Sequence, residues 1–255
     1  MSLWERALFA GILLLTVTGC SGGSTPASTQ NGATSSAPSS SAAPRALRGC
    51  VPECLAEDQT SHGGLGAGTF TAGSFLDGNF QITLPGGTWR PEDNANELMF
   101  EHTDAPNYFL AAWVDAYAVD NGKRVAGVAS TPLAMTAWIL RNRNLTASVG
   151  PRSQIGGVFP ARTVDIAVSR TATSNPASWD CPSVCYDYLG VPNLSTSPHG
   201  LARPGKARLY FSEIQYGGKR HLLTLAVEVN KGSLSAVLPA AEGAIASIRI
   251  PAQAG

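Results

Sequence analysis

The sequence predicts an α+β fold in which a mostly antiparallel β-sheet is flanked by two main helices. Apolar and polar residues alternate in short runs, most clearly at 80–84 and 162–168. A period of two is the pattern of half-buried strands. Helical patterns occur only twice and far apart, after Thr131 and after Ser233. Strands interrupted by two separated helices favour a sheet layer covered by helices.

The first strands are expected at 69–76 and 79–84, joined by the tight-turn pair Asp77-Gly78. The segment 208–229 is predicted to form a hairpin across Tyr216-Gly217-Gly218-Lys219. The clear alternation at 162–168 predicts a further strand, and weaker patterns predict strands at 98–100, 108–117, 153–155 and 248–250. The irregular segment 169–204 is rich in proline and is predicted to be a long loop.

The first helix is predicted to begin at Thr131-Pro132, where a capping hydroxyl precedes proline at the first helical position. Met135, Trp138 and Ile139 then fall on one helical face. We expect this helix to end near Asn142.

The second helix is predicted to begin at Ser233, whose hydroxyl can cap it, and to run past Ile245. Leu234, Val237 and Leu238 supply its apolar side. Pro239 removes one backbone donor, so a kink is expected there.

Residues 1–19 are predicted to be a lipoprotein signal peptide. Arg6 supplies a positive charge, and 7–17 is an uncharged apolar stretch. As a helix this stretch would cover only about 16 Å, whereas a membrane span needs about 20 apolar residues. Its length suits a cleavable signal. The segment ends in Val17-Thr18-Gly19-Cys20, which resembles a bacterial lipobox.

The resemblance to a lipobox implies that the signal is removed and that Cys20 becomes the lipidated N-terminus, carrying two or three acyl chains such as palmitate. One acyl chain holds a protein to a membrane only marginally, whereas two hold it stably. The expected location is therefore the extracytoplasmic face of the cell membrane. An ordinary secretory signal with a chance cysteine is the alternative, and Ser21 is compatible with either a plasma or an outer membrane.

The rest of the chain divides into a linker and one domain. Residues 20–64 hold the lipidated cysteine and a linker rich in Ser, Ala, Gly and Pro, which has too few large apolar side chains to fold. A flexible linker of this length spans about 30 Å on average. Residues 65–255 contain the large apolar side chains and are predicted to form a single extracytoplasmic α+β domain.

Charge excludes one class of partner. The chain has 18 basic and 18 acidic residues and no basic block. Nucleic acid is therefore not an expected partner, because its binding needs a concentrated positive surface. The expected partners are the membrane, through the anchor on Cys20, and an envelope protein or small ligand.

Four further cysteines form two C-x3-C pairs: Cys50, Cys54, Cys181 and Cys185. An even number in an exported chain predicts disulfides. Three connectivities are possible, and the two local pairs are favoured because each is already close in sequence. Closing so short a loop stabilises the folded state by about 2 kcal/mol. A four-cysteine zinc site and a redox role are the alternatives, but both usually use C-x2-C spacing.

Five segments carry a resemblance to known proteins: 67–71, 80–89, 137–145, 155–157 and 164–166. In this order they resemble a family of actinobacterial lipoproteins and membrane-tethered ectodomains of unknown function, and the resemblance covers about residues 65–250. Gly87-Thr88-Trp89 has one residue more than the Gly-Trp turn usual in that family. More distantly, the resemblance implies a PsbP-like fold. It implies no catalytic residues.

Motifs for catalysis or cofactor binding are absent from the sequence. There is no G-x-S-x-G elbow, H-E-x-x-H pair, phosphate-binding loop or calcium loop. None of the histidines, at positions 62, 102, 199 and 221, has a ligand-like spacing to another histidine or a cysteine. No catalytic residue, metal ligand or cofactor is predicted. His199 is expected to be a solvated loop residue.

Three aromatic residues lie beside the second cysteine pair: Trp179, Tyr186 and Tyr188. Aromatic side chains on a positioned loop can bind a sugar, a peptide or a protein partner. They can equally cover the edge of the core. Two acidic features are expected to be structural: Glu92-Asp93 with Glu97 as a solvated loop, and Asp165 pointing outward from its strand.

Two functions are consistent with the sequence. The first is a lipid-anchored, non-enzymatic ectodomain that binds a protein partner or small ligand at the cell envelope. The second is an envelope hydrolase whose catalytic residues converge only in three dimensions. A cleft holding His102 or His221 beside an acid and a nucleophile would favour the hydrolase. The absence of recognisable catalytic motifs from the sequence favours the binding protein.

Overall fold

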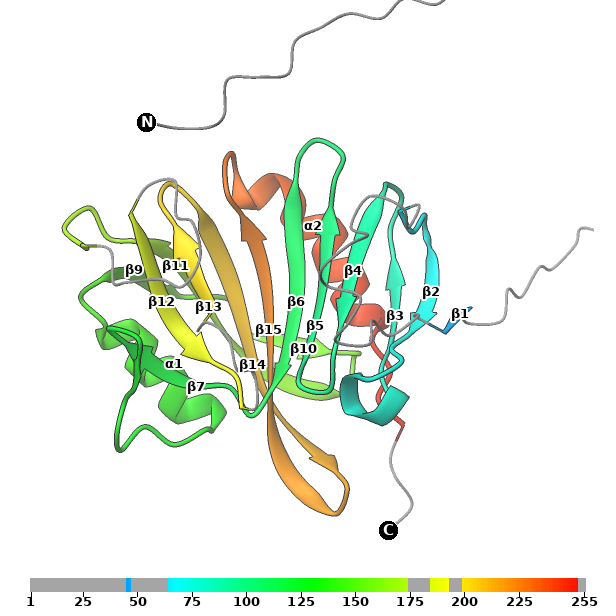
Figure 1. Ribbon diagram of the computed structural model, residues 1–255, viewed down its shortest axis with the longest axis horizontal. Coiled ribbons are helices and arrows are strands. Elements are labelled where there is room, and N and C mark those ends of the chain that lie inside the picture. Colours follow the sequence, from blue (N-terminus) through cyan, green and yellow to red (C-terminus); the bar gives the residue numbers. More distant parts are fainter. Residues whose placement is uncertain (1–44, 47–63, 174–183, 193–198, 252–255) are drawn as a thin grey trace, which may run out of the picture. The chain divides into compact units, whose positions relative to one another are not determined.

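An eight-stranded antiparallel sheet forms the centre of the computed structural model, which describes residues 45–46, 64–173, 184–192 and 199–251 (Figure 1). Its strand order is β10-β11-β14-β15-β6-β5-β4, with β9 also paired to β11. In chain order the strands are β4 (Trp89–Asp93), β5 (Glu97–His102), β6 (Tyr108–Val114), β9 (Leu145–Val149), β10 (Ser153–Ile155), β11 (Phe159–Val168), β14 (Lys206–Tyr216) and β15 (Lys219–Val229).

Two small sheets accompany it within the compact unit Ser41–Gly255. One has the order β1-β2-β3, and the other has the order β13-β12-β7-β8. Their strands are β1 (Arg45–Ala46), β2 (Gly68–Thr71), β3 (Gln81–Leu84), β7 (Tyr117–Asp120), β8 (Lys123–Arg124), β12 (Cys185–Gly190) and β13 (His199–Ala202). With helices α1 (Pro132–Arg141) and α2 (Leu234–Ser247), they confirm the predicted α+β, mostly antiparallel class.

Strand β15 explains why the central sheet has a core on each face. Residues 222–229 are all buried. Leu223, Leu225 and Val227 belong to the core that includes α2 and β3, whereas Leu222 and Ala226 belong to the core that includes α1 and β12. Alternate side chains of a strand point to opposite faces, so a strand covered on both sides is mostly apolar and loses the period-two pattern.

Helix α1 follows the predicted start signal. The Thr131 hydroxyl accepts a hydrogen bond from the backbone N–H of Ala134 at 3.3 Å, and Pro132 opens the helix. Met135 and Ile139 are fully buried against the second core. Leu133 and Leu140 remain exposed on the helix.

Helix α2 does not use its predicted cap. The Ser233 hydroxyl makes no capping hydrogen bond and lies 2.7 Å from the Ser235 hydroxyl. Pro239 lies inside the helix, which runs from Leu234 to Ser247.

Three strand predictions need correction. Strands β2 and β3 do pair antiparallel, but Asp77-Gly78 is not a two-residue turn between them: the connection contains a short 3-10 segment at 75–78, in which Leu76 and Asp77 have φ of 50° and 48°. The segment 108–117 is divided into β6 and β7 by Asp115, whose φ of 55° lies in the left-handed region. Residues 248–250 form only an isolated bridge, between Arg249 and Gln81.

The acidic cluster after Trp89 is not a solvated loop: Glu92 and Asp93 lie in β4, and Glu97 opens β5. Asp93 is buried, with 5% of its surface exposed. Its carboxylate accepts backbone hydrogen bonds from Gly73 (2.6 Å), Ser74 (3.1 Å) and Phe75 (2.9 Å). A carboxylate that accepts several N–H groups holds a loop in place, so Asp93 fixes the connection between β2 and β3.

None of the helices in the described part of the chain is both long and apolar enough to span a membrane. The predicted signal, the linker, Cys20 and the domain boundary at residue 65 are not tested by this finding, because residues 1–44 and 47–63 lie outside the described structure.

Candidate functional site

An open groove of about 360 Å³ lies beside the first turns of α2. Its floor comes from β9, β11 and β14, and its wall comes from the helix. The lining residues are Thr146, Ser148, Asp165, Ile166, Ala167, Lys206, Arg208, Ser233, Leu234, Ser235 and Leu238. Its volume is within the usual range for sites that bind small molecules.

The polar floor of this groove follows from strand register. Side chains opposite each other in paired strands point to the same face. Two such rows cross the groove: Ser148, Asp165 and Arg208 form one, and Thr146, Ala167 and Lys206 form the other. The intervening residues Val164, Ile166 and Leu209 are buried in the core that includes α1. The same strands therefore present an apolar face to one core and a largely polar face to the groove.

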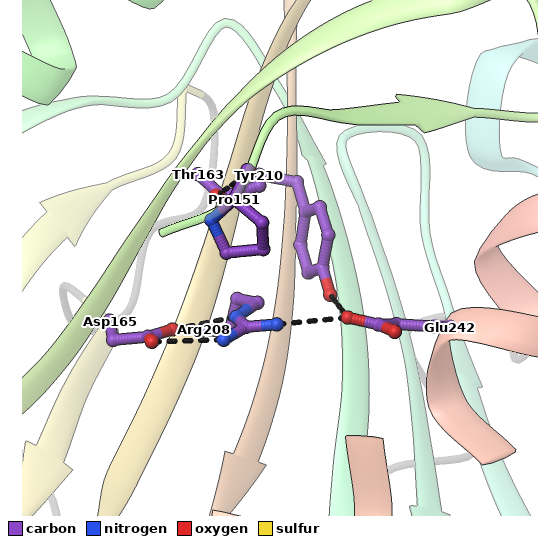
Figure 2. Close-up of polar contacts among 6 residues, drawn as sticks. All are labelled: Pro151, Thr163, Asp165, Arg208, Tyr210 and Glu242. Carbon is purple, nitrogen blue, oxygen red and sulfur yellow. Dashed lines mark hydrogen bonds and ion pairs between the residues drawn. The ribbon is translucent and has the colours of Figure 1, made fainter. Parts of the chain in front are cut away.

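Arg208 is the centre of an ion-pair network on this floor (Figure 2). Its Nε and Nη2 donate to the two carboxylate oxygens of Asp165 at 2.6 and 2.9 Å. Its Nη1 donates to Glu242 Oε1 at 2.9 Å, and the Tyr210 hydroxyl donates to the same oxygen at 3.4 Å. A two-pronged arginine–carboxylate pair fixes direction as well as charge.

The surroundings keep Arg208 charged. Hydrogen bonding to Asp165 raises the pKa of Arg208 above its ordinary value, although partial burial of the guanidinium acts in the opposite direction. The side chain of Arg208 is 13% exposed, against 34% for Asp165 and 45% for Glu242. The expectation that Asp165 points outward from its strand is consistent with this half-exposed position.

Close packing shapes the β9–β10 connection near the network. The Thr163 hydroxyl donates to the backbone carbonyl of Pro151 (Figure 2). A Cβ at Gly150 would lie 2.4 Å from the Thr163 oxygen, so only glycine fits there without a shift.

A second polar cluster is buried between the central sheet and the β12–β13 strands. His199 Nε2 and Glu228 Oε1 are 2.7 Å apart, and the Tyr188 hydroxyl donates to the same oxygen at 2.7 Å. The His199 ring lies against Trp113, with ring centroids 4.4 Å apart. The exposed fraction is 18% for the side chain of His199 and 7% for that of Glu228. We call His199, Glu228 and Tyr188 the buried triad.

Electrostatics in the buried triad favour a protonated histidine and a neutral phenol. Burial alone would lower the pKa of His199, but the Glu228 carboxylate, with smaller contributions from Glu97 and Asp187, raises it overall. Burial, reinforced by Glu228, raises the pKa of Tyr188 well above its ordinary value. The raised pKa of His199 therefore favours an imidazolium beside the Glu228 carboxylate.

The prediction that His199 is a solvated loop residue is wrong. It opens strand β13, and its ring is largely buried beside Glu228. The sequence contained one signal for this pair: Glu228 is the only charged residue among 222–229. A carboxylate inside a buried strand needs a partner.

The aromatic residues of the predicted loop are not on a loop where the structure describes them. Tyr186 and Tyr188 lie in β12, and their rings are 1% and 0% exposed. The Tyr186 hydroxyl donates to Asp120 at 2.6 Å and accepts from the Asn142 amide at 2.9 Å. The expected loop placement of these two residues is wrong, and their role in ligand binding remains a prediction.

The predicted cysteine sites lie mostly outside the described residues. Cys185 is fully buried at the start of β12 and is disulfide-bonded. Cys20, Cys50, Cys54 and Cys181 are not described, and neither is Trp179. The favoured pairings and the lipidation of Cys20 therefore remain predictions.

The other two described histidines do not form a catalytic triad within residues 64–173, 184–192 and 199–251. His221 Nδ1 lies 2.7 Å from Asp115 Oδ2. His102 Nδ1 contacts the backbone carbonyl of Asp104 at 3.0 Å, and its ring packs against Trp89 and Tyr108. In this part of the chain no serine, threonine or cysteine side chain is hydrogen-bonded to either ring, and no cluster suited to a metal ion occurs.

Comparison with known proteins gives no family assignment. No family model matches the chain, and no curated protein matches it. A solved structure from Bacteroides thetaiotaomicron has a TM-score of 0.36 and 13% identity over 74% of this chain, which spans only 50% of that protein. LpqN of Mycobacterium tuberculosis, which is involved in cell envelope biogenesis, has a TM-score of 0.40 and 10% identity over 72% of this chain and 84% of its own. Similarities this weak carry no argument about this chain, so the PsbP-like fold also remains a prediction.

Proposed function

We propose that this chain is a lipid-anchored protein of the cell envelope whose extracytoplasmic domain binds a small ligand or an envelope protein and does not catalyse a reaction. The anchor is Cys20, and the binding surface is the groove beside α2. The membrane is one partner through the lipid, and the groove occupant is the other.

The observation that carries the proposal is the makeup of the groove. Its described lining holds hydroxyls, a lysine and a fixed ion-pair network, together with apolar side chains. No histidine or cysteine is among the lining residues that the structure describes. Arg208 is held by two carboxylates, and its raised pKa keeps it protonated at neutral pH. A site with fixed charges orients a ligand, whereas acid–base catalysis needs a group that titrates near the working pH.

The hydrolase alternative has one observation in its favour. The buried triad brings an imidazole, a carboxylate and a phenol together. Against it, the Tyr188 hydroxyl is fully buried and donates to Glu228, and its raised pKa keeps it protonated. A nucleophile has to reach the substrate and lose its proton, so this arrangement supports a structural role for the triad.

Site-specific photo-cross-linking in intact cells tests binding at the groove. A photoreactive residue replaces Ser148 on the groove floor in one variant and the exposed Gln215 of β14, outside the groove, in the control. We expect a defined adduct only at position 148. Equal adducts at both positions, or none at either, would contradict the proposal.

Mass spectrometry of the mature protein tests the anchor. We expect acyl mass on Cys20, and Cys20→Ala should release the protein from the membrane fraction. The matched variant Cys50→Ala should remain anchored. A Cys20→Ala protein that stays in the membrane fraction would remove this half of the proposal.

A further inference from the structure

Hydrogen bonding leaves the groove with unused donors on its floor. Both Asp165 oxygens accept from Arg208, and Glu242 Oε1 accepts from Arg208 and Tyr210. By contrast, the side chains of Thr146, Ser148 and Lys206 form no hydrogen bond or ion pair with the described residues. The network thus uses both Asp165 oxygens and one Glu242 oxygen, while the Lys206 ammonium and two hydroxyls stay available as donors.

Charge points the same way. Lys206 and Arg208 are the basic residues that line the groove, and Asp165 is the acidic one, so the lining carries one net positive charge. Glu242 lies outside the lining, and one of its oxygens is already shared by two donors. Arg208 carries one positive charge and lies between two carboxylates, Asp165 in the lining and Glu242 outside it. Lys206 is the basic lining residue that has no carboxylate partner among the described residues, so its ammonium is the cation open to a ligand.

The rest of the lining is apolar except for Ser233 and Ser235, whose hydroxyls lie 2.7 Å from each other. Ala167 lies on the floor between Thr146 and Lys206, and Leu234 and Leu238 form part of the helical wall. An occupant that satisfies this surface has an oxyanion next to a short apolar part, because hydroxyls and an ammonium donate to oxygen while the leucines exclude water.

From these contacts we infer that the groove binds a small amphipathic oxyanion, with its carboxylate or phosphate group on Lys206, Thr146 and Ser148 and its apolar part against α2. This inference rests on the proposed function, since it names the class of ligand for the same groove. Lys206 supplies affinity through its charge, and the two hydroxyls direct the oxyanion.

Titration of the full chain in detergent tests the inference with three probes: butyrate, inorganic phosphate and butyramide. The readout is the NMR shift of the Ala167 and Thr146 methyl groups. We expect saturable shifts with butyrate and with phosphate and much weaker shifts with butyramide, which keeps the apolar part and loses the charge. Stronger binding of butyrate than of phosphate would identify the carboxylate as the preferred source of the oxyanion.

Charge-matched variants show whether the site is local. Lys206→Ala should weaken butyrate binding about tenfold, equivalent to the loss of one modest charge-assisted contact. Lys206→Arg should retain most of the affinity. The control Lys219→Ala removes the same charge from an exposed position outside the groove and should leave the affinity unchanged.

Three outcomes would overturn the inference: butyramide binding as well as butyrate, equal weakening in both alanine variants, or no saturable shift with either anion. Its failure is distinguishable from failure of the proposed function. A cross-linked adduct at position 148 without anion binding would leave the binding function in place and reject only the ligand class.

Discussion

The buried triad and the ion-pair network around Arg208 both contain carboxylates in or beside the central sheet. They differ in access to solvent. Glu228 of the triad is 7% exposed, whereas Asp165 and Glu242 are 34% and 45% exposed. The triad lies under β12 and β13, and the Arg208 network lies at the edge of an open groove. Carboxylates on one face of the sheet are therefore buried, whereas those on the other face are partly open to solvent.

This difference in solvent exposure indicates which polar groups are available to a ligand. In the triad every named group already has a partner, and removing one would leave a buried charge or hydroxyl unsatisfied. In the groove, solvent can replace a lost partner, and neighbouring donors remain unused. We therefore expect triad variants to lose stability and groove variants to lose binding.

Glu228→Gln is expected to cause the largest loss of folding stability. It removes the charge that His199 and Tyr188 share, and breaking a buried ion pair costs about 3–5 kcal/mol of folding stability. The measurement is the free energy of unfolding in urea. The matched control Glu242→Gln changes an exposed partner of Arg208 and should cost no more than about 1 kcal/mol. Equal losses in the two variants would show that burial does not separate the networks.

His199→Gln is expected to have a smaller effect that depends on pH. The pKa of His199 is raised in the folded protein, so protonation stabilises the fold fully below the unfolded-state value of about 6.5. This contribution is lost as the pH rises through the folded-state pKa. Urea unfolding across this pH range should show stability falling with pH in the wild type and a flatter profile in the variant.

The pH profile has its own control in the Glu228→Gln background. Without the carboxylate, the main cause of the raised pKa is absent, so the profile should flatten there as well. A wild-type slope that survives both substitutions would assign the pH dependence to other groups.

Asp165→Asn is expected to have the smallest effect on stability. Its pair with Arg208 is partly exposed, so the loss should be below about 1 kcal/mol and should shrink as salt is added. Urea unfolding at low and high salt measures it. Glu213→Gln, which alters the exposed pair with Arg220, is the matched control and should have no measurable effect. A loss as large as that of Glu228→Gln would contradict the distinction between the two faces.

Local signals were sufficient for several elements. Thr131-Pro132 predicted the start of α1 because capping and proline preference depend on neighbouring residues alone. The tight turn across 216–219 likewise predicted the β14–β15 hairpin. Asp93 was mispredicted because its partners lie about twenty residues away, in the 73–75 segment. The sequence suggested that Asp93 lies in a solvated loop, whereas in the fold its buried carboxylate accepts backbone hydrogen bonds.

The candidate site shows the same boundary between local and distant information. Asp165 was expected to point outward by alternation along its strand, and it faces the groove. That Arg208 would bind Asp165, and that Glu242 would bind Arg208, could not be predicted, because Arg208 and Glu242 lie 43 and 77 positions after Asp165 in the chain. His199 and Glu228 are 29 positions apart in the sequence and belong to two different sheets. No spacing rule connects residues whose distance depends on strand order.

The sequence by itself determined the α+β class, the two helices, the antiparallel hairpin and the expectation of a lipidated Cys20, because each rests on periodicity or on a short local motif. Only the tertiary structure decided which carboxylates are buried from solvent and which line a groove. Burial depends on which segments cover each face of the sheet, and those segments are distant in sequence. The physical reason is that a side chain's charge and partners are set by its three-dimensional surroundings.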